Sequence, residues 1–262
     1  MYTHYKKILR HIKHYYQLYI LVLPAVVIIF LFNYIPMYGV QIAFREFDPT
    51  KGFAGGEFVG LKYFIKFINS FQFTDLIKNT FLLSFYSIAA GFPVPIVLAL
   101  IINQIKNSKA KKFIQTVSYM PHFISVIVLV GMLSIFLSPS SGIIGHIYRT
   151  LGLEAINFMG VPKYFRFIYV FSDIWQHSGW NSIIYIAALS AIDPNLYEAA
   201  EVDGANRWQK LVKIDIPSLM PTIVILLILN SGNILNIGFE KIYLMQNSMN
   251  LPVSEVISTY VY

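Results

Sequence analysis

The sequence contains no cysteine and few charged residues. Without cysteine, disulfide bonds, thiolate zinc sites and cysteine nucleophiles are excluded. Charged side chains make up 13% of the 262 residues, whereas a soluble domain carries about 25%. Hydrophobic residues make up 56%, and the mean hydropathy is +0.59. These values exclude a disordered chain, a disulfide-stapled secreted fold and an ordinary soluble enzyme, and they indicate an all-α integral membrane protein.

The net charge of +7 does not indicate a nucleic-acid partner. A nucleic-acid-binding protein concentrates Lys and Arg on one face. Here these residues fall in short clusters between apolar runs, as in a protein that orients itself in a membrane. We therefore expect membrane lipid, and no nucleic acid, as a partner.

Five apolar runs each approach the ~20 residues needed to cross a bilayer. They predict spans at about 18–34, 76–102, 113–137, 167–189 and 218–237 within a single domain, 1–262. A signal peptide competes for the first run, but no cleavage site of small residues follows it. A last apolar stretch begins near Leu251 and is too short to span, so we expect a sixth span that is truncated.

Basic residues predict the orientation of the chain. With the N-terminus inside, the segments 1–17, 103–112 and 190–217 are cytoplasmic, and their density of Lys and Arg is about twice that of the outside segments. On the outside, the segment 61–73 repeats aromatic residues at helical spacing. It is either an amphipathic helix at the membrane interface or a helix that caps the bundle.

The segment 193–221 is the most informative part of the sequence. Asp193 followed by Pro194 is typical of a helix start, acidic residues follow early and lysines late, and Pro217 is expected to end the helix. Residues four apart predict one stripe along this helix, formed by Leu196, Ala200, Gly204 and Trp208. Gly204 costs about 1 kcal/mol in a helix interior, which indicates either a break or the close approach of another surface.

Small and acidic residues make this helix a candidate docking surface in a cytoplasmic loop, 190–217. The candidate docking residues are Glu198, Ala199, Ala200, Glu201, Asp203, Gly204, Ala205 and Trp208. A short interfacial helix that merely links two spans is the alternative.

The same segment resembles the EAA loop of ABC importer permeases, whose pattern is Glu-Ala-Ala, three residues, Gly, and a later Ile-x-Leu-Pro. The matching residues are Glu198, Ala199, Ala200, Asp203, Gly204, Ala205, Ile214, Ile216, Pro217 and Pro221, with Ile216 in place of the usual leucine. The runs 60–69, 79–103 and 111–125 resemble the oligosaccharide and polysaccharide permeases of the carbohydrate branch.

This resemblance implies a type I ABC importer transmembrane domain with five full spans and the start of a sixth, in the cell membrane of a prokaryote. It implies three kinds of protein partner: a second permease, forming a heterodimer, two ATP-binding cassette subunits and an extracytoplasmic solute-binding protein. The sequence has no Walker A motif, so ATP and Mg are expected in the partner ATPase, with no cofactor bound by this chain.

Polar residues within spans are candidates for the substrate path. They are Trp175, His177, Trp180, Asn181, Asn230, Asn233 and Asn236. The tryptophans fit an aromatic belt equally, and the asparagines fit helix-to-helix hydrogen bonds. A permease of the same architecture for a peptide or amino acid, and a membrane-embedded enzyme, remain alternatives. We assign no catalytic and no metal-binding residue, because the spans contain almost no carboxylates.

Overall fold

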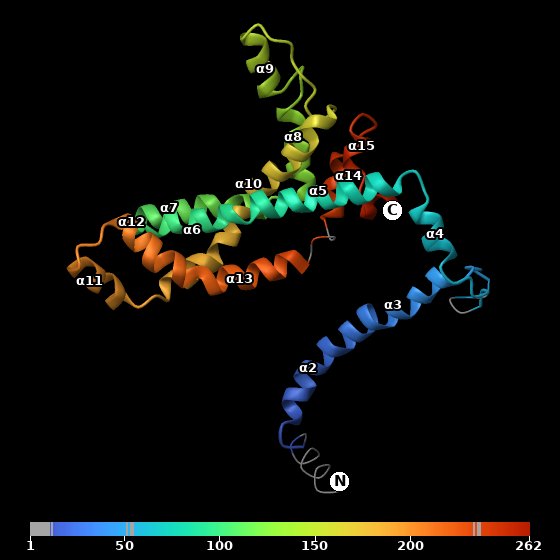
Figure 1. Ribbon diagram of the computed structural model, residues 1–262, viewed down its shortest axis with the longest axis horizontal. Coiled ribbons are helices and arrows are strands. Elements are labelled where there is room, and N and C mark those ends of the chain that lie inside the picture. Colours follow the sequence, from blue (N-terminus) through green and yellow to red (C-terminus); the bar gives the residue numbers. More distant parts are fainter. Residues whose placement is uncertain (1–10, 12, 51, 53–54, 233, 235–236) are drawn as a thin grey trace. The chain divides into compact units, whose positions relative to one another are not determined.

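The computed structural model describes residues 11, 13–50, 52, 55–232, 234 and 237–262. In these residues the regular elements are helices (Figure 1), and one isolated antiparallel bridge joins Arg45 and Phe58. The chain divides into two compact units, Met1–Phe73 and Thr74–Tyr262. Each unit is described by itself.

The first unit contains one long apolar helix and one short helix. α2 (Tyr16–Ile29), η1 (Phe30–Tyr34), α3 (Ile35–Met37) and η2 (Tyr38–Phe44) follow one another as a helix of 29 residues. This helix continues about ten residues past the predicted end of the first span, and none of its apolar window is buried. Of the predicted amphipathic segment 61–73, the part Lys62–Ile68 is helical (α4).

Two long rods of the second unit agree with apolar runs in the sequence. α5 (Phe73–Gly91) and α6 (Pro93–Asn103) form one rod of 31 residues, because Pro93 and Pro95 fall in the first turn of α6, where a missing N–H costs little. α12 (Arg207–Lys210), η4 (Leu211–Asp215) and α13 (Ile216–Gly232) form a second rod of 26 residues.

The predicted span 113–137 is broken. α7 (Ser108–Tyr119) and η3 (Met120–Phe123) meet α8 (Val126–Phe136) at an angle of 96°. Pro121 lies at the start of the 3-10 turn, Ile124 is extended, and the Ser125 hydroxyl caps α8 by accepting from the N–H of Val128. The break frees the carbonyl of Ile124, which accepts a hydrogen bond of 2.7 Å from Nε2 of Gln176.

α10 (Pro162–Ser190) covers the predicted span 167–189, and buried residues recur along it from Phe165 to Leu189. Among the described helices, three are long and apolar enough to cross a membrane, or four if the bent pair counts as one span. α10 is not among them, because polar residues lie along its middle. Instead it packs against α6, α7, α13 and α15 (Leu251–Ser254), which cover it.

Two hydrophobic clusters hold these helices together. One joins the first half of α10 to α5, α8 and α14 (Phe239–Met245), through residues such as Leu83, Val130, Phe165 and Ile242. The other joins the second half of α10 to α6 and α13, through Ala99, Leu189 and Leu219. Each of these named side chains is buried.

Hydrogen bonds bring together segments that were predicted to share a side of the membrane. Beyond α9 (Ile143–Thr150), the carbonyl of Met159 accepts from the side chains of Asn247 and Asn250. The final apolar stretch forms α15 and α16 (Ile257–Val261), and Nδ2 of Asn79 donates to the carbonyls of Pro252 and Glu255. At the other end of the rods, Gln104 donates to Asp215.

The segment 193–217 is not the single helix that its pattern predicts. α11 (Pro194–Val202) begins as expected, since the Asp193 carboxylate accepts from the N–H of Asn195. It ends after Val202, because Gly204 has φ +76° and closes the helix with two bonds, Gly204 N–H to Glu201 O and Ala205 N–H to Ala200 O. The stripe from Leu196 to Trp208 is therefore wrong past this turn.

A new helix begins immediately after this turn. Asn206 and Gln209 form a capping box at the start of α12. Pro217 does not end a helix, as was expected, but is the second residue of α13. The last rod therefore begins at Arg207 rather than at 218, and it is described as far as Gly232; residues 233, 235 and 236 of the predicted span lie outside the described residues.

Gly179→Ala tests the contact between α10 and α7. A Cβ at Gly179 would lie 1.9 Å from the carbonyl oxygen of Ser118, so the two helices must separate. We expect a loss of about 2–3 kcal/mol of stability, measured by thermal unfolding of the purified protein in detergent. Gly131→Ala in α8 is the matched control, because its Cβ meets no atom within 4 Å and alanine favours the helix. Equal effects of the two substitutions would contradict the contact.

Candidate functional site

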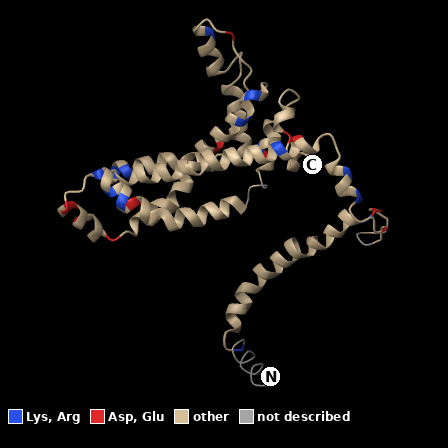
Figure 2. Ribbon diagram, viewed as in Figure 1, with Lys and Arg blue, Asp and Glu red and all other residues tan. Residues whose placement is uncertain are grey.

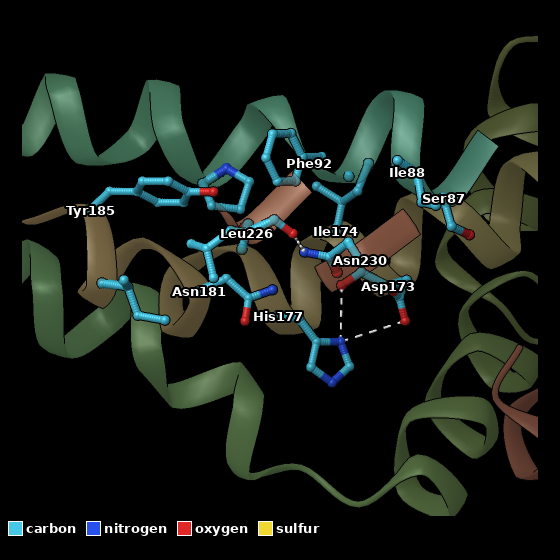
Figure 3. A pocket seen from close by; sticks show the side chains of 14 residues that line it. Ser87, Ile88, Phe92, Asp173, Ile174, His177, Asn181, Tyr185, Leu226 and Asn230 are labelled. Atoms are coloured by element: carbon cyan, nitrogen blue, oxygen red, sulfur yellow. Dashed lines mark hydrogen bonds and ion pairs between the residues drawn. The ribbon is translucent and has the colours of Figure 1, made fainter. Parts of the chain in front are cut away.

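A cavity of about 250 Å³ lies between α5, α6, α10 and α13 (Figure 3). Three of the predicted substrate-path residues line it: His177, Asn181 and Asn230. His177 and Asn181 belong to α10 and lie four residues apart, so they share one face of the helix with Asp173. The other polar lining residues are Ser87, Ser178 and Tyr185. The cavity therefore has an amide, imidazole and hydroxyl lining within an apolar bundle.

Asp173 connects this cavity to a second cavity of about 340 Å³. The two cavities share five lining residues, which are Ser87, Ile88, Asp173, His177 and Asn230. Nδ1 of His177 lies 3.5 Å from the Asp173 carboxylate and 3.2 Å from the Asp173 carbonyl oxygen, as the dashed lines in Figure 3 mark. The shared lining makes the two cavities parts of one polar region.

Lys241, in α14, is the buried cation of this region. Its Nζ lies 3.2 Å from Oδ1 of Asp173, donates to the carbonyl of Tyr169 at 3.1 Å, and lies 4.8 Å from the centre of the Tyr169 ring. The side chain is 5% exposed. Sequence reasoning placed Lys241 in an outside segment and missed it as a site residue. The signal in the sequence was the carboxylate of Asp173, the one Asp, Glu, Lys or Arg in the predicted span 167–189, because a carboxylate there needs a partner.

The two predicted tryptophans do not line either cavity. The ring of Trp180 stacks on the ring of His122, with centres 4.5 Å apart and planes inclined by 4°, and His122 in turn lies 5.5 Å from His177. Trp175 and Trp180 are 44% and 41% exposed. Asn230 lines both cavities while its Nδ2 donates to Leu226 of its own helix. Asn233 and Asn236 lie outside the described residues.

The predicted docking residues lie at the opposite end of α10 from α15 and form an exposed surface. Glu198, Ala199, Ala200 and Glu201 belong to α11, Asp203, Gly204 and Ala205 to the turn that follows, and Trp208 to α12. Trp208 is 71% exposed and Val202 is 89% exposed. Figure 2 shows charged residues of both signs gathered around α11, α12 and the start of α7.

Glu201 is paired within the chain rather than free. Its carboxylate accepts a hydrogen bond of 2.6 Å from Nζ of Lys210 in the next helix. This bond and the charge of Lys210 hold the pKa of Glu201 below its ordinary value, and Lys106 near α7 contributes to the same shift. Lys106 and Glu201 come from two segments that were predicted to lie on one side of the membrane.

Asp215 is a second buried acid that sequence reasoning missed. It lies in η4, is fully buried, and accepts hydrogen bonds from the hydroxyl of Tyr197 in α11 and from Nε2 of Gln104 at the end of α6. Burial, together with the carboxylate of Asp215, raises the pKa of Tyr197. In the described part of the chain no three His, Cys, Asp or Glu residues gather as metal ligands would.

The arrangement of long apolar helices around a polar cavity, with an exposed capped helix between two of them, defines a membrane transport protein. Residues 91–262 match the family described as the binding-protein-dependent transport system inner membrane component, and the chain belongs to this family. Its members are the transport subunits of ABC importers in bacterial membranes, and they work with partner permease and ATPase subunits.

Similar proteins span most of the chain. The polygalacturonan/rhamnogalacturonan transport system permease protein YteP of Bacillus subtilis is 43% identical over 94% of this chain and 76% of its own length. Protein LplB of the same organism is 39% identical over 94% and 77%. A bacterial ABC transporter that imports the acidic polysaccharide alginate has a chain with a TM-score of 0.89 and 41% identity, which covers 98% of this chain and 86% of that one.

The alginate transporter is also known in complex with a periplasmic protein that holds an alginate pentasaccharide, with a TM-score of 0.87 and 41% identity over 97% of this chain and 84% of that one. These likenesses confirm the predicted fold class, a type I importer permease, and the predicted function as a permease subunit related to the carbohydrate importers.

Lys241→Met tests the buried ion pair. Removing the ammonium leaves the Asp173 carboxylate without its cation, and we expect a loss of about 2 kcal/mol, below the range for fully buried pairs because the Asp173 side chain is 39% exposed. The double variant Lys241→Met with Asp173→Asn should recover most of this loss in thermal unfolding. Lys163→Met, at an exposed lysine of α10, is the control. A double variant less stable than Lys241→Met alone would contradict the pairing.

Proposed function

We propose that this chain is the permease subunit of an ATP-driven importer of acidic oligosaccharides. The observation that carries the proposal is the similarity of more than 40% identity over nearly the whole chain to the permease for polygalacturonan and rhamnogalacturonan and to the alginate importer. These relatives handle chains of sugars that bear carboxylates. An external binding protein delivers the substrate to a heterodimer of this chain and a second permease.

The substrate path runs through the joined cavities beside α10. Amides and hydroxyls of Asn181, Asn230 and Tyr185 suit the hydroxyl groups of sugars, and His177 and Lys241 are groups whose N–H can donate to carboxylates. Asp173 and Glu240 also line the region, so the local charge is balanced rather than strongly positive. Trp180, stacked on His122, offers a flat face beside the path at which a sugar ring can lie.

The ATPase subunits dock on α11 and the turn after it. The surface is exposed, it carries Glu198 and Asp203 for basic partners, and Gly204 leaves its Cβ position open, with no atom within 4 Å. ATP and Mg bind in the partner subunits, since the sequence has no Walker A motif. This docking requires the N-terminus and α11 to be cytoplasmic, which is the orientation that the basic segments favour.

The substrate class is tested on the reconstituted complex in vesicles. We expect the binding protein loaded with oligogalacturonate or alginate oligomers to stimulate ATP hydrolysis at least fivefold, because relatives more than 40% identical to this chain handle sugars that bear carboxylates. Neutral oligosaccharides of the same length are the matched control and should stimulate it little. Stimulation by neutral sugars or by peptides, with none by the acidic oligomers, would overturn this assignment.

The docking surface is tested by Gly204→Arg and Glu198→Lys. We expect each to reduce co-purification of the ATPase subunits about tenfold, while the chain still inserts into the membrane, because an added side chain or a reversed charge separates the surfaces. Gly152→Arg is a closely matched control. Gly152 has φ +71°, no atom within 4 Å of its Cβ position, and the same pair of closing hydrogen bonds after α9.

Because Gly152→Arg and Gly204→Arg carry the same backbone strain, a difference between them reports the surface and not the strain. Glu154→Lys, an exposed acid near Gly152, is the control for charge reversal. Unchanged ATPase retention in both docking variants, or an equal loss in the controls, would remove the support for docking on α11.

A further inference from the structure

The carboxylate of Asp215 joins three helices at one point. Oδ1 accepts from the hydroxyl of Tyr197 at 2.5 Å, and Oδ2 accepts from Nε2 of Gln104 at 3.1 Å. Tyr197 lies in the middle of α11, Gln104 caps the end of α6, and Asp215 ends the π-helical turn η4 that leads into α13. Residues 111 and 18 positions apart in the sequence therefore meet on a single side chain.

The charge of Asp215 is stabilised by neutral donors alone. The side chain is fully buried, and among the described residues no Lys, Arg or His forms an ion pair with it. A buried carboxylate is costly unless hydrogen bonds compensate for lost water, and bonds to an ionised acceptor are stronger than bonds to a neutral one. Each donor is therefore held firmly in place.

The position of Asp215 within its helix is set by the π turn. The rod Arg207–Gly232 is a continuous helix in which η4 carries one extra residue per turn. Such turns are rare and are frequently found at functional sites. Because Asp215 is fully buried, it contacts α11 from inside the bundle rather than from the surface.

The carboxylate of Asp215 also connects α11 to the two helices that line the cavity, α6 and α13. α6 contributes Pro95 from its first turn and its N-cap residue Phe92 to the cavity, and α13 contributes Leu226 and Asn230. Between the cavity and Asp215, α6 and α13 pack on α10 through the cluster that contains Ala99, Leu189 and Leu219. If α11 moves while its hydrogen bond to Asp215 stays intact, α6 and α13 therefore move with it.

The other link between α11 and the rod cannot replace this one. The pair Glu201 and Lys210 is close, but the Glu201 side chain is 70% exposed, and exposed pairs hold side chains weakly. It also joins α11 only to the neighbouring helix and leaves α6 untouched.

We propose that Asp215 is a positioning residue that transmits the motion of α11 to α6 and α13, and so to the cavity. The inference rests on the proposed docking of the ATPase on α11. Asp215 does not touch substrate or nucleotide; it acts through the hydroxyl of Tyr197 and the amide of Gln104.

The test uses the reconstituted complex with Asp215→Asn and Tyr197→Phe, measuring ATP hydrolysis and substrate uptake in the same vesicles. We expect assembly and basal ATP hydrolysis within twofold of the unsubstituted complex, and uptake per ATP reduced at least fivefold. The double variant should be no worse than the poorer single variant, because both act on the same hydrogen bond: Tyr197→Phe removes its donor, and Asp215→Asn replaces the carboxylate acceptor by an amide. Asp75→Asn and Tyr63→Phe, at exposed positions, are the matched controls.

A rescue separates transmission from a merely structural role. Because the chain has no cysteine, Tyr197→Cys with Asp215→Cys can be bridged by a bifunctional thiol reagent, with Asp215→Cys alone as the reagent control. We expect the bridge to restore uptake per ATP at least threefold. If Asp215→Asn does not assemble, Tyr197→Phe, which removes one oxygen atom, decides the question.

Unchanged uptake per ATP in Tyr197→Phe and Asp215→Asn, or additive losses without rescue, would overturn the role of Asp215 while leaving the docking on α11 intact. Failure of the docking proposal gives a different result, since Gly204→Arg and Glu198→Lys would then retain the ATPase subunits as fully as Gly152→Arg does.

Discussion

The structure depends on covering the polar middle of α10. Asp173, Gln176 and His177 lie on a helix long enough to cross a bilayer, yet such side chains are costly in hydrocarbon. α6, α7, α13 and α15 pack on this helix, and groups from other segments bond to two of its polar side chains. Gln176 bonds to the carbonyl of Ile124, and Lys241 pairs with Asp173. The cavity is the space left where the remaining polar groups face one another.

The break at Ile124 and the polar helix α10 each supply the hydrogen-bond partner that the other needs. A membrane helix can bend by 96° only where the backbone groups it frees find partners within the protein. Gln176 supplies that partner, and the absence of a side chain at Gly179 lets α7 approach α10 closely enough for it to do so. Neither feature is stable alone, because an unpaired carbonyl and an unpaired amide would both be buried.

Much of the helical layout could be predicted from the sequence, because apolar runs of about 20 residues are rare outside membrane spans. The runs near 76–102 and 167–189 correspond to rods within a few residues. The cost of Gly204 indicated a break or a close contact, and the structure has the break. The 96° bend was missed, because Pro121 and Ser125 lie inside the apolar run 113–137, which was interpreted as one continuous span.

The site could be predicted only in part, because its chemistry depends on contacts between distant segments. His177, Asn181 and Asn230 were found because polar residues in spans are unusual, whatever their partners. Lys241 and Asp215 were missed. Lys241 stands 68 residues from Asp173, and Asp215 stands 111 residues from Gln104, so no local pattern connects them. In the family pattern Asp215 occupies the unspecified position between Ile214 and Ile216, so the pattern predicts no residue type there.

The short length of α11 explains why the proposed transmission needs the buried contact between Tyr197 and Asp215. A helix of nine residues is not stable by itself in water, so its rigidity must come from packing against the rest of the chain. No residue of α11 is buried, and its outer face is exposed. Such a helix can therefore transmit force only through the contacts on its inner side. Among its hydrogen bonds, the one from Tyr197 ends on a fully buried group that also contacts a second rod. A helix that is too short to be rigid on its own can in this way move two rods that line a cavity.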